Sequence, residues 1–185
     1  MQEKKLKVEF SSRLITENQE LNLLDKSEVL DLACGSGRNG LWFADKGHRV
    51  TFIDKSLANL CMPSEPQADS MPTEHTYLAW DLEDGSAPEL AQNKYDLVLV
   101  FNYLHRPLFP QIAATVKPGG LIVYETFIDK QAEIGRPRNP KFLLKSNELK
   151  NEFEKWTLLH YFEGEVMSDL NLSYKAQLIA RKPSC

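Results

Sequence analysis

Short apolar runs recur along the chain, and turn-forming residues bound most of them. Runs of this length and composition predict buried β-strands at 28–32, 48–54, 76–80, 95–101 and 121–127. The run at 95–101 is almost continuously apolar, which is typical of a parallel strand covered on both faces. Two later runs, 156–162 and 173–181, leave no room for a helix between them. They predict an antiparallel hairpin at the edge of the sheet.

Segments with helical spacing of apolar residues lie between the strands. They predict one helix within 8–24, a short helix at 39–46 that ends at Gly47, and a helix at 147–155. Residues 56–61 predict only a turn or two of helix, because prolines interrupt the chain soon afterwards. Strands that alternate with helices predict an α/β fold with a mostly parallel, seven-stranded sheet.

Chain length and net charge limit the number of domains and the kinds of partner that we expect. With 185 residues the chain is about the size of one domain, so we expect a single domain over 1–185. The net charge of −4 argues against nonspecific nucleic-acid binding as the main role. No apolar run approaches the roughly 20 residues that span a bilayer, and the charged opening stretch lacks the apolar core of a signal peptide. We therefore expect a cytoplasmic protein that does not cross a membrane.

The stretch from Asp31 to Gly40 is the strongest candidate for a ligand site. Gly35 and Gly37 allow a sharp turn after the first strand, and the helix that follows presents its free N–H groups to the same space. As a bare pattern, the glycines and Asp54 at the end of the next strand fit the dinucleotide fingerprint. Asp31 argues against a dinucleotide, because its carboxylate would repel a pyrophosphate but would suit the ammonium of an amino acid. S-adenosylmethionine offers that ammonium and carries no phosphate.

The stretch Asp31-Leu-Ala-Cys-Gly-Ser-Gly37 resembles motif I of the class I S-adenosylmethionine-dependent methyltransferases. The turn Lys117-Pro-Gly-Gly120 ahead of an apolar strand is also frequent in that class. Together with the stretch from Asp31 to Gly40, the run 135–145 resembles the sequences of the small tellurite-resistance-type group within that class. The likeness extends over nearly the whole chain, from 11 to 182. It implies a single doubly wound Rossmann-like domain with an antiparallel edge hairpin and helices on both faces of the sheet. The expected parts are a leading helical segment (8–26), a cofactor-binding core (27–127), an active-site loop (128–145) and a helix with the edge hairpin (146–185).

The resemblance also implies where the cofactor lies. Asp31 and the backbone from Gly35 to Gly37 would hold the methionine end, and Asp54 would take the ribose hydroxyls. Asp81, or the backbone of Leu82, would contact the adenine amino group. The alternatives are that Asp31 caps the turn, that Asp54 caps the next helix, and that Asp81 belongs to an acidic turn. The residues expected to bind the cofactor are Asp31, Ala33, Gly35, Gly37, Arg38, Asn39, Asp54, Lys55, Asp81, Leu82 and Phe101.

Candidate catalytic residues follow the carboxyl ends of the fourth and fifth strands, where an open α/β sheet binds its ligands. His105 suits a general base or an orienting group, although it could equally fix the loop 102–107. Tyr103 is expected to pack on the methyl group or to donate to the acceptor, and Glu125 is the alternative base. Four arginines are candidates to bind an anionic substrate group, or else are solvated surface charges: Arg13, Arg106, Arg136 and Arg138.

Together these features predict an S-adenosylmethionine-dependent methyltransferase that releases S-adenosylhomocysteine. The three cysteines have no metal-ligand spacing, so no metal is expected. The expected acceptor is a small, soft or anionic molecule, namely a thiol, a chalcogen oxyanion or a carboxylate, and a base is needed only if that acceptor must lose a proton. A non-catalytic module that binds the cofactor is the alternative. An RNA methyltransferase is less favoured, because Asn102-Tyr103 lacks the two intervening prolines of the motif used for exocyclic amines. We expect a monomer or a weak homodimer.

Overall fold

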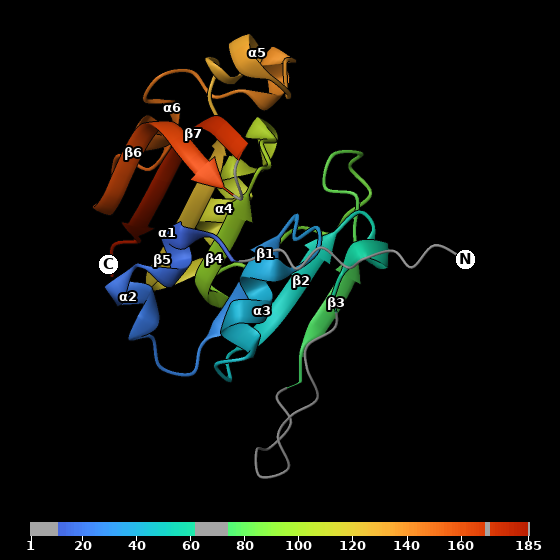
Figure 1. The fold of residues 1–185 in the computed structure, drawn as a ribbon. Coiled ribbons are helices and arrows are strands. Elements are labelled where there is room, and N and C mark those ends of the chain that lie inside the picture. Colours follow the sequence, from blue (N-terminus) through green and yellow to red (C-terminus); the bar gives the residue numbers. More distant parts are fainter. Residues whose placement is uncertain (1–10, 62–73, 169–170, 185) are drawn as a thin grey trace.

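The computed structural model describes residues 11–61, 74–168 and 171–184. They form a seven-stranded sheet with the strand order β3-β2-β1-β4-β5-β7-β6 (Figure 1). Strands β1 to β5 pair in parallel, whereas β7 pairs antiparallel with both β5 and β6. This arrangement confirms the predicted α/β fold, with its mostly parallel sheet and antiparallel edge hairpin. The strands are β1 (Glu28–Leu32), β2 (Arg49–Asp54), β3 (Thr76–Ala79), β4 (Tyr95–Phe101), β5 (Val116–Phe127), β6 (Thr157–Ser168) and β7 (Asn171–Arg181).

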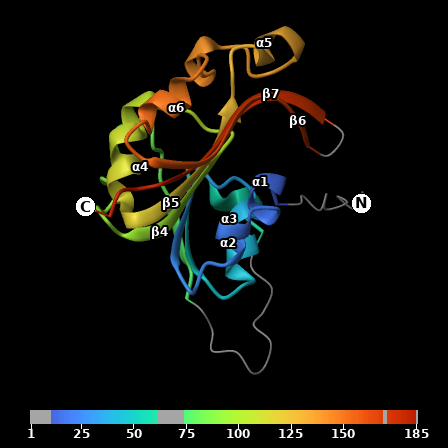
Figure 2. The same cartoon turned by 90° about the vertical axis from the view of Figure 1, so that its left-hand side faces the viewer.

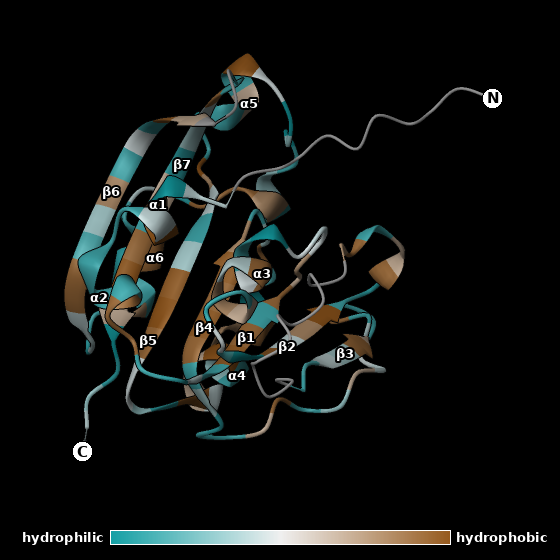
Figure 3. Cartoon of the chain, turned by 60° about the horizontal axis from the view of Figure 1, so that its bottom comes forward, coloured by the Kyte–Doolittle hydropathy of each residue, from teal (hydrophilic) through white to brown (hydrophobic). Residues whose placement is uncertain are grey.

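Helices cover both faces of the sheet, as expected. On one face α1 (Arg13–Thr16), α2 (Gln19–Asn22) and α3 (Arg38–Ala44) pack over alternate residues of the central strands, such as Leu97 and Leu99. On the other face α4 (Phe109–Thr115) and α6 (Glu148–Glu152) pack over the intervening residues, such as Val98 and Val100. Figure 2 shows the two groups of helices on opposite sides of the sheet. Figure 3 shows hydrophobic residues concentrated in β1, β2 and β4, which explains the near-continuous apolar runs.

The helices depart from the prediction more than the strands do. Where one helix was expected within 8–24, the described residues form two single-turn helices, because the side chains of Ser12 and Asn18 each cap a new helix start. Helix α4 was not expected, and Pro110 in its first turn hides its helical pattern. The helix expected at 147–155 is shorter and forms α6.

Short elements and loops occupy the carboxyl edge of the parallel strands. They include the 3₁₀ turns η1 (Leu57–Asn59), η2 (Arg106–Leu108) and η3 (Pro140–Phe142), and the single-turn helix α5 (Gln131–Ile134). Only η1 stands where a turn or two of helix was expected at 56–61. The interrupting prolines at 63, 66 and 72, and the first residues of the leading segment, lie outside the described residues.

Candidate functional site

The turn between β1 and α3 has an unusual backbone. Ala33, Gly35 and Gly37 all have positive φ values, of 55°, 57° and 75°. A left-handed backbone is unfavourable for alanine, and such strain concentrates at binding sites. The Gly35 N–H donates to Asp54 Oδ2 at 2.8 Å, which ties the turn to the end of β2. The φ of 75° favours glycine at position 37, and a Cβ atom there would also lie 2.3 Å from Leu60 Cδ1, so the leucine side chain would have to move.

Asp31 lies beneath this turn with 2% of its surface exposed. Its Oδ2 accepts the N–H of Gly40 at 2.8 Å, which satisfies a donor at the start of α3. Burial raises the pKa of Asp31 to about 7, and the Gly40 N–H offsets part of this effect. A carboxylate in such surroundings gains from a ligand that brings a positive charge. The contact with Gly40 agrees with the capping interpretation, and the role of Asp31 toward an ammonium stays a prediction.

A cavity of about 370 Å³ opens beyond the ends of β1, β2, β3 and β4. The Glu83 N–H and the Lys55 ammonium, at 3.0 and 3.2 Å from the two oxygens of Asp81, lower the pKa of Asp81 and keep it charged. Asp54 likewise accepts the Ser56 N–H at 3.0 Å, so both acids have local backbone partners. Five expected cofactor-binding residues meet in this cavity: Ala33, Asp54, Lys55, Asp81 and Leu82.

The Tyr103 hydroxyl borders the same cavity. It is buried and has no hydrogen-bond partner among the described residues. Burial raises the pKa of Tyr103, and the nearby carboxylates of Glu83, Asp81 and Asp54 raise it further, so the hydroxyl stays protonated and can donate. A ligand oxygen or nitrogen in the cavity would satisfy this donor. The structure therefore groups Tyr103 with the expected cofactor residues and not with Glu125.

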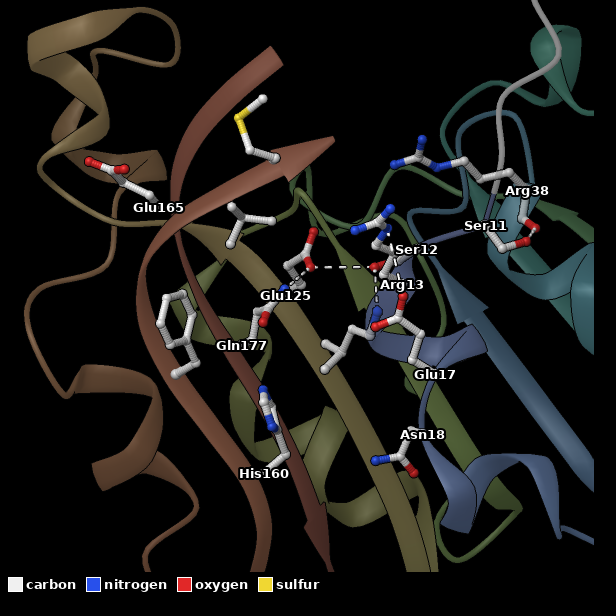
Figure 4. Close-up of a pocket in the computed structure, with 14 residues that line it drawn as sticks. Ser11, Ser12, Arg13, Glu17, Asn18, Arg38, Glu125, His160, Glu165 and Gln177 are labelled. Carbon is white, nitrogen blue, oxygen red and sulfur yellow. Dashed lines mark hydrogen bonds and ion pairs between the residues drawn. The ribbon is translucent and has the colours of Figure 1, made fainter. Parts of the chain in front are cut away.

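A larger cavity, of about 990 Å³, lies between α1, the start of α3 and the β6–β7 hairpin (Figure 4). Arg13 and Arg38 both line it. The Ser11 hydroxyl donates to the Arg38 carbonyl oxygen at 2.8 Å, and the Ser12 N–H donates to Asn39 Oδ1 at 3.0 Å, which brings the two segments together. The lining residues are Ser11, Ser12, Arg13, Leu14, Glu17, Asn18, Arg38, Glu125, His160, Phe162, Glu165, Val166, Met167 and Gln177.

Glu125 lies at the sheet side of this larger cavity and is 3% exposed. Its Oε1 accepts Lys175 Nζ at 2.8 Å, while its Oε2 accepts Gln177 Nε2 at 2.7 Å and Ser12 Oγ at 3.4 Å. Lys175 and Gln177 lie on β7, so the network joins β5 to β7. Both oxygens of Glu125 already have donors, so this geometry favours a positioning role. Its role as a base stays a prediction.

His105 and Arg106 lie outside both cavities. His105 is half-buried just before η2 and lines neither cavity. Arg106 makes a two-pronged ion pair with Glu148 and donates to the carbonyl oxygens of Lys141 and Leu143. Its guanidinium therefore holds the loop together, and this geometry does not favour the predicted substrate contact.

Three other predicted residues also stand apart. Arg136 and Arg138 are exposed in the loop after α5, and Phe101 is buried in the core; none of them lines either cavity. The predicted catalytic residues Tyr103, His105 and Glu125 are likewise not gathered in one place: the first borders the smaller cavity, the second neither, and the third the larger. The structure does not support treating these three as one catalytic group.

Sequence reasoning missed His160 on β6 and Gln177 on β7, which both line the larger cavity. Lys175 and Gln177 gave a usable signal, because they alternate with apolar residues in a strand that otherwise reads as buried. His160 gave no comparable signal.

No group of three or more histidine, cysteine, aspartate or glutamate side chains in the described ranges is placed to hold a metal ion. Among the same described residues, no helix has the length and apolar character needed to span a membrane.

Comparison with known proteins identifies relatives of this chain. Residues 7–173 match the family model described as tellurite resistance protein TehB. The chain is 30% identical over 151 residues to a Haemophilus influenzae protein named "Probable S-adenosyl-L-methionine-dependent methyltransferase TehB", a match that covers 77% of this chain and 50% of the relative. The chain thus spans about half the length of the curated TehB relatives it matches.

Solved structures share the fold at lower identity. TehB from Haemophilus influenzae superposes with a TM-score of 0.67 at 22% identity, over 88% of this chain and 60% of that chain. A Burkholderia thailandensis 1,6-didemethyltoxoflavin-N1-methyltransferase, solved with 1,6-didemethyltoxoflavin and S-adenosylhomocysteine bound, gives a TM-score of 0.56 at 20% identity, over 85% of this chain and 71% of that chain. At these identities the likeness shows the fold alone.

Proposed function

The chain belongs to the tellurite-resistance TehB family, and on this basis we propose that it is an S-adenosylmethionine-dependent methyltransferase whose acceptor is a small, soft or anionic molecule. The observation that carries the proposal is the pair of cavities on either side of the turn after β1. The smaller one borders Ala33 in that turn, and the larger one borders Arg38 at the start of the helix that follows it.

The residues around the turn fit S-adenosylmethionine. The carboxylates of Asp54 and Asp81 offer acceptors for the hydroxyl and amino donors of a nucleoside, and the unpaired Tyr103 hydroxyl offers a donor. Asp31 is buried, which raises its pKa to about 7, so its charged form gains from a neighbouring ammonium. Acidic groups in this arrangement would repel a pyrophosphate, so they disfavour a dinucleotide.

The larger cavity suits a small acceptor. Its volume of about 990 Å³ is at the upper end of the range of roughly 300–1,000 Å³ typical of small-molecule sites. Arg13 and Arg38 offer forked donors to an oxyanion or carboxylate. Glu17 is only a weak competitor for Arg13, because the two side chains are 3.7 Å apart and mostly exposed.

The cofactor, when bound, supplies a sulfonium methyl group for in-line displacement. The protein then needs to bind, orient and shield the acceptor, and correct orientation alone can supply a large part of the acceleration. Glu125, fixed by Lys175 and Gln177, gives the cavity a rigid polar side. Leu14 and Val166 add apolar surface that excludes water from the acceptor. An acceptor that is already ionised needs no base.

The first experiment is calorimetric binding of S-adenosylmethionine and S-adenosylhomocysteine, with NADH as control. We expect both to bind and NADH not to bind. A screen of thiols, chalcogen oxyanions and carboxylates then follows, with formation of S-adenosylhomocysteine as the readout and mass spectrometry of the methylated product. Cofactor binding without turnover on any acceptor would favour the non-catalytic module. Absence of cofactor binding would overturn the proposal.

A further inference from the structure

His160 in the larger cavity is not used by any chemistry described above. Its Nε2 is buried and has no hydrogen-bond partner among the described residues. Buried polar atoms in folded proteins nearly always have a partner, so an exception calls for a cause. Because His160 lines the cavity, a ligand group there would supply the missing partner.

A β-bulge places His160 on the cavity side of the sheet. Leu158 pairs with Ala180 and His160 pairs with Ile179, so Leu159 is an extra residue in β6. Without this bulge, Leu159 would pair with Ile179 and His160 would point to the opposite face. The irregularity therefore replaces a leucine by a histidine at this point of the cavity.

The register also places His160 next to the Glu125 network. Gln177 on β7 pairs with Glu125 on β5, and Ile179 lies two residues further along β7 on the same face. His160 pairs with Ile179, so it occupies that face one row from Gln177. Figure 4 shows its ring turned toward Gln177. Glu125, Gln177 and His160 thus form a polar line across β5, β7 and β6.

The charges around the cavity are about balanced, so they admit an acceptor with an anionic oxygen. Lys175 is paired with Glu125, which reduces the repulsion that this carboxylate would exert on an anion. Of the other acids in the lining, Glu17 is mostly exposed, so solvent screens its charge, and the exposed Glu165 accepts the Tyr174 hydroxyl at 2.8 Å. Arg13 and Arg38 add two guanidinium groups to the same cavity.

We propose that His160 binds the methyl acceptor, and that its Nε2–H donates to an oxyanion or carboxylate oxygen of that acceptor in the larger cavity. The inference rests on the proposed methyltransferase function. It narrows the acceptor from three chemical classes to the two that carry an anionic oxygen, and it makes β6 part of the acceptor site.

The test uses the full chain saturated with S-adenosylhomocysteine, so that binding is measured without turnover. Selenite and malonate are the probes for the oxyanion and carboxylate classes, and calorimetry measures their affinities. His160→Phe keeps a ring of similar shape and removes the nitrogen. We expect it to weaken binding of at least one probe about tenfold, the effect of one hydrogen bond to a charged group. His160→Gln retains a donor and should preserve most of that affinity.

Leu158→Gln is the matched control. Leu158 lies on β6, is 41% exposed and belongs to the register on the opposite face, so its replacement should leave probe binding unchanged. S-adenosylhomocysteine should bind every variant as it binds the wild type, which also shows that each variant is folded. Equal probe affinities of wild type and His160→Phe would overturn the inference, as would failure of both probes to bind a protein that binds S-adenosylhomocysteine. A wild type that does not bind S-adenosylhomocysteine would overturn the proposed function itself, and this inference with it.

Discussion

Asp31 meets two requirements that conflict within a single residue. Its carboxylate stabilises the start of α3 through the Gly40 N–H, yet burial penalises the charge that a cofactor ammonium would need. Because the pKa of Asp31 is raised to about 7, its contribution to stability is present below the unfolded pKa near ~3.9 and is lost as the pH rises through about 7. The ligand-free protein is therefore less stable at pH 8 than it would be with a neutral side chain.

Asp31→Asn should stabilise the ligand-free protein, because the amide oxygen keeps the Gly40 contact without a buried charge. We expect a gain of at least ~1 kcal/mol in the free energy of unfolding at pH 8, and a gain that shrinks as the pH falls toward 4. Urea unfolding at several pH values measures it. A pH-independent difference between wild type and variant would contradict this account of Asp31.

The same substitution should weaken S-adenosylmethionine binding at pH 8 at least tenfold, since the charge partner of the ammonium is lost. Wild-type binding should weaken as the pH falls below about 7, because Asp31 becomes protonated. Calorimetry at pH 6 and pH 8 tests both statements. His105→Ala, at a residue that lines neither cavity, should by contrast leave cofactor affinity close to that of the wild type, and equal losses in the two variants would count against the role proposed for Asp31.

The sequence locates residues well where the chain itself fixes their position. Ala33 follows β1 and Asp54 ends β2, so their meeting at one edge of the sheet could be predicted. His160 could not be found this way, because a bulge reverses the alternation that assigns side chains to faces. The predicted substrate contact of Arg106 is not favoured by the structure, for another reason. Its ion-pair partner Glu148 is distant in sequence, so the pair could not be recognised from the residues around Arg106.

At the scale of elements, the Glu125–Lys175 ion pair is a main polar link between β5 and β7. Both side chains are almost fully buried, at 4% and 5% exposure. Removal of one partner from a buried pair leaves an uncompensated charge, whereas replacement of both by apolar residues is much less harmful. The pair therefore makes stability depend on both residues together.

Lys175→Met should lower the free energy of unfolding by about 3 kcal/mol or more, and the double variant Glu125→Leu/Lys175→Met should lose less than Lys175→Met alone. Urea unfolding of the two variants measures this coupling. The control is Arg49→Met, which removes a cross-strand pair between β1 and β2 in which Arg49 and Glu28 are 59% and 31% exposed. It should cost less than about 1 kcal/mol. A similar loss in Lys175→Met and Arg49→Met would refute the special weight given to the buried pair.

Strands could be predicted more reliably than helices in this protein. The bounds of β4 match the apolar run 95–101. A strand covered on both faces is apolar along nearly its whole length, so its first and last residues can be predicted from the sequence. Helices α1 and α2 are single turns stabilised by caps and packing. The helical spacing of apolar residues across 8–24 therefore predicted one helix where the structure has two. Helix α4 is only seven residues long and carries Pro110 in its first turn, so its helical pattern was not recognised.

For the whole molecule, fold and family followed from the order of motifs, while the acceptor depends on side chains that distant strands bring together. Gln177 on β7 meets Glu125 on β5 although more than fifty residues separate them, and no local pattern encodes that meeting. The acceptor class is therefore a proposal from the cavity, not from motif I. That the chain spans about half of its curated TehB relatives adds a reason to test activity on this chain directly.

The position of β7 has a consequence for how the protein folds. β7 follows β6 in sequence, yet it lies between β5 and β6 in the sheet, and β6 pairs with β7. β6 therefore joins the sheet together with β7 or after it, and the docking of β7 on β5, two strands about fifty residues apart in sequence, is slow. Pulse-labelled hydrogen exchange during refolding should show amides of β1, β2 and β4 protected before those of β6, and simultaneous protection would argue against this sequence of events. A newly made chain would then form the edge proposed to hold a nucleoside first and the wall proposed to select a second molecule last.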